Sequence, residues 1–105
     1  MTNTVESGPG MRITGFIWDD EDDDSGNVAH IARHGVSREE VEESLTDNPL
    51  VLRGADGRYL AYGKTADGRL LFVVFVQSGR GMIRPLTARA MTDRERRLYR
   101  RRRGE

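Results

Sequence analysis

Cysteine is absent from all 105 residues, which excludes disulfide bonds and thiolate metal sites and is typical of the reducing cytoplasm. The longest apolar run, Leu70 to Val76, is far too short to cross a bilayer. No basic segment followed by an apolar stretch marks a signal peptide. The sequence also lacks a nucleotide-binding loop, a serine-nucleophile motif and a cofactor fingerprint. We therefore expect a soluble cytoplasmic protein without a bound cofactor.

The net charge is zero, but acidic and basic residues are segregated along the chain. Residues 19–24 are all acidic, whereas arginines crowd residues 94–103, and Lys64 is the only lysine. Six adjacent carboxylates repel each other too strongly to be buried together, so this run predicts a loop. It lacks the spaced ligands and central glycine of a calcium loop. The basic C-terminal segment can bind polyanions, or it can simply be a solvated face.

The chain length predicts one domain. Residues 1–10 lack periodicity and end in turn formers, so we interpret them as a disordered leader before a single domain at 11–105. A short helix is predicted over residues 27–34, with Gly35 as its left-handed cap. Ser37 and Glu40 form a capping-box pattern that opens a second helix. Thr92 and Glu95 repeat this pattern before a final helix that runs to about residue 103.

Alternating or continuous apolar residues predict five strands, at residues 12–18, 50–53, 58–64, 70–77 and 82–88. The strand at 70–77 is apolar on both faces, which indicates the buried centre of the sheet. Pro85 indicates an edge or a bulge in the last strand. The predicted fold is α+β: an antiparallel four- to five-stranded sheet with two N-terminal helices and one C-terminal helix, packed on one face of the sheet.

An ordered set of short motifs resembles the BrnT-type toxins of type II toxin–antitoxin systems over residues 12–100. The motifs are Phe16-x-Trp18-Asp19, His34-Gly-Val-Ser-x-Glu-Glu40, Asn48-Pro49, Gly-Arg58-Tyr, Gly68-Arg-Leu-Leu, Ile83-Arg84-x-x-Thr-Ala-Arg89 and Glu95-Arg-Arg-x-Tyr99. The sequence departs from the usual pattern at three places. The acidic run replaces a lysine region, His30 stands where that family has an asparagine, and Arg33 replaces a lysine. The chain is therefore similar to a divergent BrnT-like branch.

This resemblance implies a compact RelE-like ribonuclease that cleaves cellular RNA without a metal. It also implies a partner, an antitoxin of the ribbon-helix-helix type, and a homodimer or a toxin–antitoxin hetero-oligomer. The alternative is a non-catalytic module of the same fold that binds RNA or protein. A third possibility is a metal-dependent enzyme built on the histidine pair.

RNA cleavage without metal needs a base for the 2′-hydroxyl, an acid for the leaving oxygen and cations for the phosphorane charge. His30 and His34 are the only histidines, and their spacing puts them one helical turn apart on one face. They are our candidates for base and acid. The same pair can instead share a zinc ion, or His34 can interact with the helix C-terminus.

Arginine suits the third role, because its planar fork grips phosphate oxygens with two hydrogen bonds. We expect Arg58, Arg84 and Arg89 to form a catalytic anion site on the sheet, with a histidine above it. The alternative is that these arginines pair with Asp56, Glu39 or Glu40 and stabilise the surface. Further candidates for substrate binding are Trp18, Tyr62, Lys64, Arg96 and Arg97. Trp18 can stack on a base or belong to the core, and the arginine-rich tail can contact RNA backbone or an acidic antitoxin segment.

Overall fold

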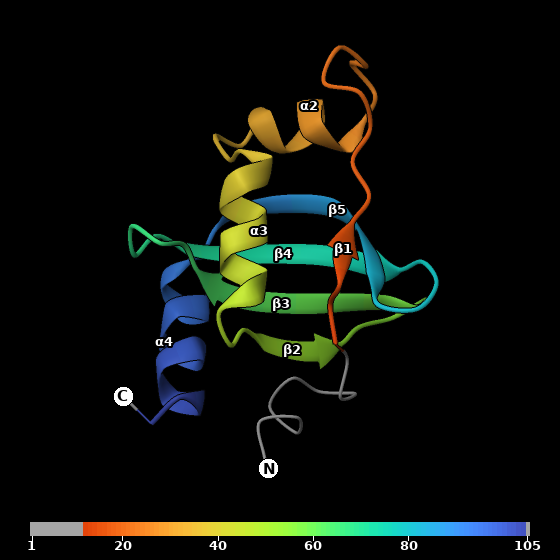
Figure 1. Ribbon diagram of the computed structural model, residues 1–105. Coiled ribbons are helices and arrows are strands. Elements are labelled where there is room, and N and C mark those ends of the chain that lie inside the picture. The colour runs from red at the N-terminus through yellow and green to blue at the C-terminus, as the bar shows by residue number, and fades with distance from the viewer. Residues whose placement is uncertain (1–11, 105) are drawn as a thin grey trace.

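The sheet and its three helices follow one another in the order predicted from the sequence (Figure 1). The computed structural model describes residues 12–104, so the predicted leader at 1–10 lies outside the described residues. The elements are β1 (Gly15–Phe16), α2 (Asn27–Ala32), α3 (Arg38–Thr46), β2 (Leu50–Arg53), β3 (Arg58–Lys64), β4 (Leu70–Gln77), β5 (Met82–Ala90) and α4 (Asp93–Arg102). None of the helices within residues 12–104 is long and apolar enough to cross a membrane.

The five strands form one mixed sheet in the order β1-β5-β4-β3-β2. Strands β2 to β5 are antiparallel neighbours, but β1 lies parallel to β5, with Gly15 opposite Met82 and Phe16 opposite Ile83. The prediction of a purely antiparallel sheet was therefore wrong. Apolar alternation identifies a strand without giving its direction. The direction of β1 is set by where the chain returns after two helices and three further strands.

Strand β4 is the centre of the sheet, as its two apolar faces predicted. On one face, α2 and α3 cover the larger core, where Val41 and Leu45 of α3 are buried against the sheet. Val73 and Phe75 of β4 are fully buried in this core. Helix α3 crosses β3 so closely that Gly63 lies against the backbone of Ser44.

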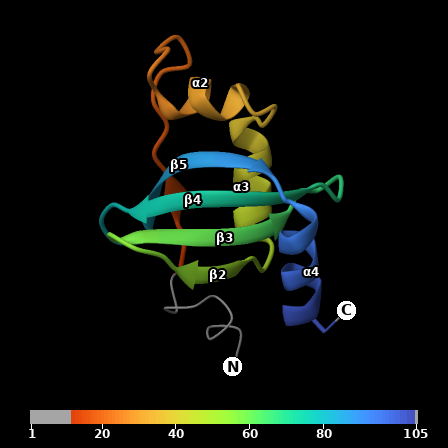
Figure 2. The same ribbon diagram turned by 180° about the vertical axis from the view of Figure 1, so that it is seen from behind.

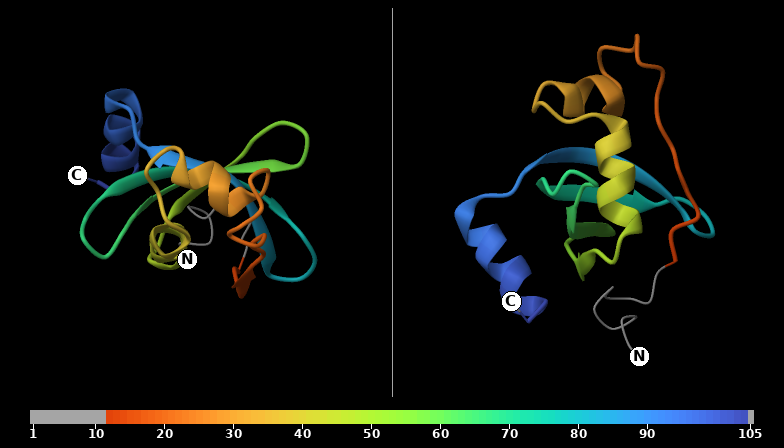
Figure 3. Two further views of the ribbon diagram at one scale, coloured as in Figure 1. Left: turned by 90° about the horizontal axis from the view of Figure 1, so that it is seen from above. Right: turned by 60° about the vertical axis from the view of Figure 1, so that its left-hand side comes forward.

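Helix α4 packs on the opposite face of the sheet, so the prediction that all helices share one face was wrong (Figures 2 and 3). Tyr99 of α4 is buried together with Leu50, Tyr62 and Met91 in a second cluster. The odd-numbered residues of β3 and β4 face α3 and the even-numbered residues face away. Because both sets are apolar, each face of the sheet needs its own cover.

Local capping signals behave as their sequence patterns predict. Ser37 and Thr92 each accept a hydrogen bond from the backbone three residues on, and Glu40 and Glu95 bond back to complete both capping boxes. Gly35 has a φ of 74°, the left-handed conformation expected after α2. The β4–β5 register shifts by one residue between Val74 and Phe75, which confirms the bulge expected near Pro85.

Candidate functional site

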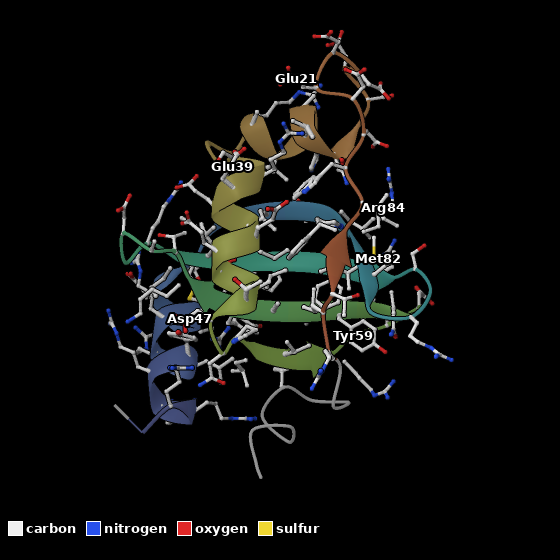
Figure 4. All side chains as sticks on the ribbon, in the orientation of Figure 1. Glu21, Glu39, Asp47, Tyr59, Met82 and Arg84 are labelled. Carbon is white, nitrogen blue, oxygen red and sulfur yellow. The ribbon has the colours of Figure 1, made fainter. Side chains whose placement is uncertain are left out.

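A shallow hollow of about 220 Å³ lies where the N-terminal end of α2 meets β5. His30 of α2 and Arg84 of β5, two of the predicted catalytic residues, both line it. Its remaining lining residues are Ser25, Gly26, Asn27, Pro85 and Leu86. Figure 4 shows Arg84 beside the segment that leads from β1 towards α2. The hollow therefore combines one imidazole and one guanidinium from distant parts of the sequence.

Arg84 is held by the carboxylate of Asp19 in a two-pronged contact. Its Nη1 and Nη2 donate to the two carboxylate oxygens at 3.1 and 2.6 Å. The hydrogen bonds from Arg84 are the largest of several causes that hold the pKa of Asp19 below its usual value. The Arg84 side chain is still 36% exposed. Arg84 therefore has a fixed orientation and remains accessible to a ligand.

Asn27 locks the segment that carries Asp19. The backbone N–H of Asn27 donates to Asp19 Oδ2, and its side-chain oxygen accepts from the Asp19 backbone N–H. The Asn27 amide nitrogen donates to the carbonyls of Ile17 and Pro85. Asn27 is only 5% exposed, and such a buried amide is stable only when its hydrogen-bonding groups are satisfied. These contacts join the end of β1, the start of α2 and β5 beside Arg84.

His30 is half-buried and contacts β5 directly, with its Nε2 3.1 Å from Thr87 Oγ1. His34 is exposed, just beyond α2, and its ring meets that of His30 edge-on with centroids 5.2 Å apart. The prediction from their helical spacing that the His30 and His34 rings lie next to each other is confirmed. Thr87 fixes one nitrogen of His30 and leaves Nδ1 for another partner.

Arg89 lies at the other end of β5 and belongs to a different group of side chains. Arg89 is five positions along the strand from Arg84, which is about 16 Å at 3.3 Å per residue. It makes a two-pronged contact with Glu95 at 2.7 and 2.9 Å, and its guanidinium stacks over the ring of Phe72 at 4.5 Å. Tyr62 is buried beside Phe72, and this burial is the main cause that raises the pKa of its hydroxyl.

The other predicted residues are spread over the molecule. Arg58 of β3 and Arg84 of β5 lie on one face and in one row of the sheet, because each is directly opposite Val76 of β4. The Arg58 guanidinium is 4.0 Å from the carboxylate of Asp56. Lys64 is exposed at the end of β3. On α4, Arg96 contacts Asp93 at 2.9 Å and Arg97 is exposed.

Trp18 packs against the larger core and stacks on Phe16, and its indole N–H donates to Glu42 at 2.8 Å. Its ring is therefore engaged within the protein, as expected for the core alternative. Of the surface ion pairs considered as the alternative, Arg58 with Asp56 forms. Arg84 and Arg89 pair with Asp19 and Glu95 instead, and Glu40 is paired with Arg69.

The acidic run forms a loop, as expected, and beyond Asp19 the hydrogen bonds of Asp20 and Asp23 are local. Asp20 accepts from the backbone of Asp22, and Asp23 accepts from both the backbone and the hydroxyl of Ser25. Across residues 12–104, no three His, Cys, Asp or Glu side chains are arranged to hold a metal ion. Neither the loop nor the histidine pair therefore offers a complete ligand set within that range.

Sequence reasoning missed Asp19 and Asn27, the two residues that orient Arg84. A signal for each was present. Asp19 is the one carboxylate of the acidic run that directly follows Trp18, and Asn27 is the polar residue at the first position of a helix. Nothing in the local pattern, however, links either residue to β5, where Pro85 lies 58 positions from Asn27 and Arg84 lies 65 positions from Asp19.

The Asp19–Arg84 contact predicts acid sensitivity. Because the folded-state pKa of Asp19 is lowered, the unfolded chain binds more protons than the folded protein as the pH falls towards 4. The contribution of this carboxylate to stability is complete above about pH 4 and disappears as the pH falls through the folded pKa. We expect an Asp19→Asn variant to unfold at a lower temperature than the native protein at pH 7, with the difference shrinking towards pH 3. Thermal unfolding across this range measures it, and a difference that grows on acidification would contradict the assignment.

Comparison with known proteins agrees with this architecture. A profile described as "Ribonuclease toxin, BrnT, of type II toxin-antitoxin system" matches residues 18–95. The crystal structure of the Brucella abortus ribonuclease toxin BrnT superposes with a TM-score of 0.54 and 21% sequence identity, covering 79% of this chain and 99% of that one. No curated protein sequence matches this chain. The match to the profile spans most of the described sheet, both core helices and the start of α4, and the chain therefore belongs to the BrnT family of ribonuclease toxins of type II toxin–antitoxin systems.

Proposed function

We propose that this protein is an endoribonuclease toxin that cleaves RNA without a metal ion and is neutralised by a ribbon-helix-helix antitoxin. The observation that carries the proposal is the presence of His30 and Arg84 in one hollow, in a chain of this family. An imidazole titrates close to neutral pH, and a guanidinium is a permanent cation with a fork that fits phosphate oxygens. Together they supply proton transfer and charge stabilisation at a single phosphate.

In the proposed reaction His30 acts as the base. With Nε2 protonated and donating to Thr87, Nδ1 accepts the proton of the 2′-hydroxyl. The 2′-oxygen attacks phosphorus, the bond to the 5′-oxygen breaks, and the products are a 2′,3′-cyclic phosphate and a 5′-hydroxyl. His34, next to His30, supplies the proton that the leaving oxygen needs. Arg84 stabilises the charge that develops on the phosphoryl oxygens.

Asp19 and Asn27 are positioning residues in this scheme. Asp19 holds two of the guanidinium nitrogens of Arg84, and Asn27 fixes Asp19 to α2 and β5. Preorganisation of this kind matters because a cation that is already oriented needs no rearrangement when charge develops in the transition state. A substrate phosphate either binds the free edge of the guanidinium or displaces the carboxylate.

In this proposal the arginines of α4 contact the phosphates of the RNA backbone. Arg97 is exposed, and the first and last turns of this helix carry further exposed arginines. Lys64 extends the same basic end of the molecule and, with Arg96, adds to this contact. Binding through such phosphate contacts is expected to weaken steeply with salt.

A non-catalytic binding module is the second candidate, and one observation favours it. Both Arg84 and Arg89 are already engaged by carboxylates, Asp19 and Glu95, in two-pronged contacts. An arginine paired in this way stabilises the fold without any chemistry. In that case the chain binds its partner, or RNA, and cuts nothing.

Induced expression in a bacterial host, with and without the adjacent gene as the candidate antitoxin, separates the two candidates. The nuclease predicts growth arrest and fragmented RNA when the protein is expressed alone, and intact RNA when the antitoxin is present. Normal growth and intact RNA at high expression would reject the nuclease and leave the binding module.

A further inference from the structure

The face of the sheet that carries α4 is only partly covered. Within residues 12–104, α4 is the one helix on this side, and it lies over the row Leu50–Tyr62–Phe72 at one end of the strands. Figure 2 shows α4 at one end of the strands and no other helix over their middle. The next row of side chains is Leu52, Leu60, Val74 and Thr87, and the row beyond it is Arg58, Val76 and Arg84.

These two rows form an apolar strip with a basic border. Leu52, Leu60, Val74 and Val76 all retain partial solvent exposure, whereas Leu71, Val73 and Phe75 on the opposite face of β4 are fully buried. Neighbouring apolar side chains left accessible on a small protein typically mark an interaction site. The Arg58 side chain, at one edge of the strip, is 52% exposed.

We infer that this strip, defined by Leu52, Leu60, Val74 and Val76, is the docking surface for the protein antitoxin, through a segment that carries apolar side chains and carboxylates. The inference rests on the proposed function, since it names the partner that regulates the same site. Apolar side chains of the partner cover the leucines and valines, and its carboxylates face Arg58. Because Arg84 ends the same row and also lines the hollow, a segment lying on the strip blocks access to His30.

The chemistry of the strip fits a protein segment better than RNA. Bases bind single-stranded sites by stacking on aromatic rings, and these two partly exposed rows contain none. The nearby aromatic side chains are engaged, because Tyr62 is buried and Phe72 lies under the Arg89 guanidinium. A groove of about 410 Å³ between α2 and α3 has the apolar side chains of Val28, Ala32 and Val36 in its lining. Its border carries Glu21, Glu39 and Glu40 against one arginine, Arg38, so it would suit a basic segment instead.

Leucine-to-aspartate substitutions in the strip test the proposal. Leu60→Asp places a carboxylate in the middle of the strip, and Leu52→Asp places one on the edge strand β2, where the fold is more tolerant. We expect each to weaken binding of the purified antitoxin about 100-fold or more, as is found for central interface positions. Leu60→Lys should weaken binding less than Leu60→Asp, because a lysine attracts an acidic partner. Val28→Asp, in the groove between α2 and α3, is the matched control and should bind normally.

Calorimetric titration measures binding, and thermal unfolding confirms that each variant is folded. Unchanged binding by folded Leu52→Asp and Leu60→Asp would overturn the proposal, and so would loss of binding by Val28→Asp alone. Equal effects of Leu60→Asp and Leu60→Lys would reject the acidic character of the partner. RNA cleavage is assayed separately on the same variants. Loss of antitoxin binding with cleavage intact supports the docking surface, whereas absence of cleavage by the native protein contradicts only the nuclease.

Discussion

Replacing Arg84 by alanine is expected to lower the rate of RNA cleavage about 100-fold or more while the protein remains folded. Removing one preorganised group that stabilises transition-state charge typically has an effect of this size. Arg84 is the cation of the hollow, and it is partly exposed beside His30. Its role depends on two hydrogen bonds in a fixed plane, so Arg84→Lys should restore little of the activity although it keeps the charge.

Arg80→Ala is the matched control for this experiment. Arg80 lies four residues away, exposed in the turn between β4 and β5, and its loss should leave cleavage unchanged. Because Arg84 also anchors Asp19, the unfolding temperature of each variant must be measured alongside its activity. Full cleavage by a folded Arg84→Ala variant would remove the arginine from the mechanism.

Replacing Gly63 by alanine is expected to destabilise the fold by about 3 kcal/mol or more, a cost at the upper end of that for overpacking a core. A methyl group at this position would lie 2.8 Å from the carbonyl carbon of Ser44 and closer still to its oxygen. The methyl group would be attached directly to the backbone of β3 and would meet the backbone of α3, so no side-chain rotation can relieve the clash. Either α3 lifts from β3 or the strand bends. In a domain of this size the change corresponds to a fall of about 12 °C or more in the unfolding midpoint.

Gly54→Ala, in the turn between β2 and β3, provides the comparison. Its added methyl group would lie 3.3 Å from the carbonyl oxygen of Arg58 at an exposed position, so we expect a change below about 1 kcal/mol. Urea unfolding of the three proteins measures the difference. Equal stability of the two variants would show that α3 does not pack as closely on β3 as described.

Local signals account for most of the secondary structure that could be predicted. The bounds of β2, β3 and β4 agree with the runs predicted from apolar alternation and turn residues, and both capping boxes form. Each of these features is determined within about ten residues of chain. The helix predicted at 27–34 ends at Ala32 and is followed by a turn that closes at Gly35.

The errors in the fold prediction involve contacts between distant segments. The direction of β1 depends on residues 82–83, and the side on which α4 packs depends on Leu50 and Tyr62. An apolar residue in a strand predicts burial, but it does not identify the element that packs on it. Both faces of β4 are apolar, and the sequence pattern does not say which helix covers which face.

The candidate site was predictable by residue type but not by arrangement. The need for a base and a cation singled out His30 and Arg84, and both line the hollow. Arg89 was grouped with them because it lies on the same strand, yet Glu95 and Phe72 hold it at the far end. The sequence does not mark Asp19 as a partner of Arg84, because it is the first of six adjacent acidic residues. Its contacts with Asn27 and Arg84 in the folded protein distinguish it from the rest.

Analysis of the RNA ends left by the purified protein in the presence of EDTA tests the central claim most directly. If His30 and Arg84 act on one phosphate without a metal, cleavage proceeds and leaves a 2′,3′-cyclic phosphate and a 5′-hydroxyl, and His30→Ala abolishes it. Cleavage that stops on chelation, or that leaves a 5′-phosphate, would contradict the claim.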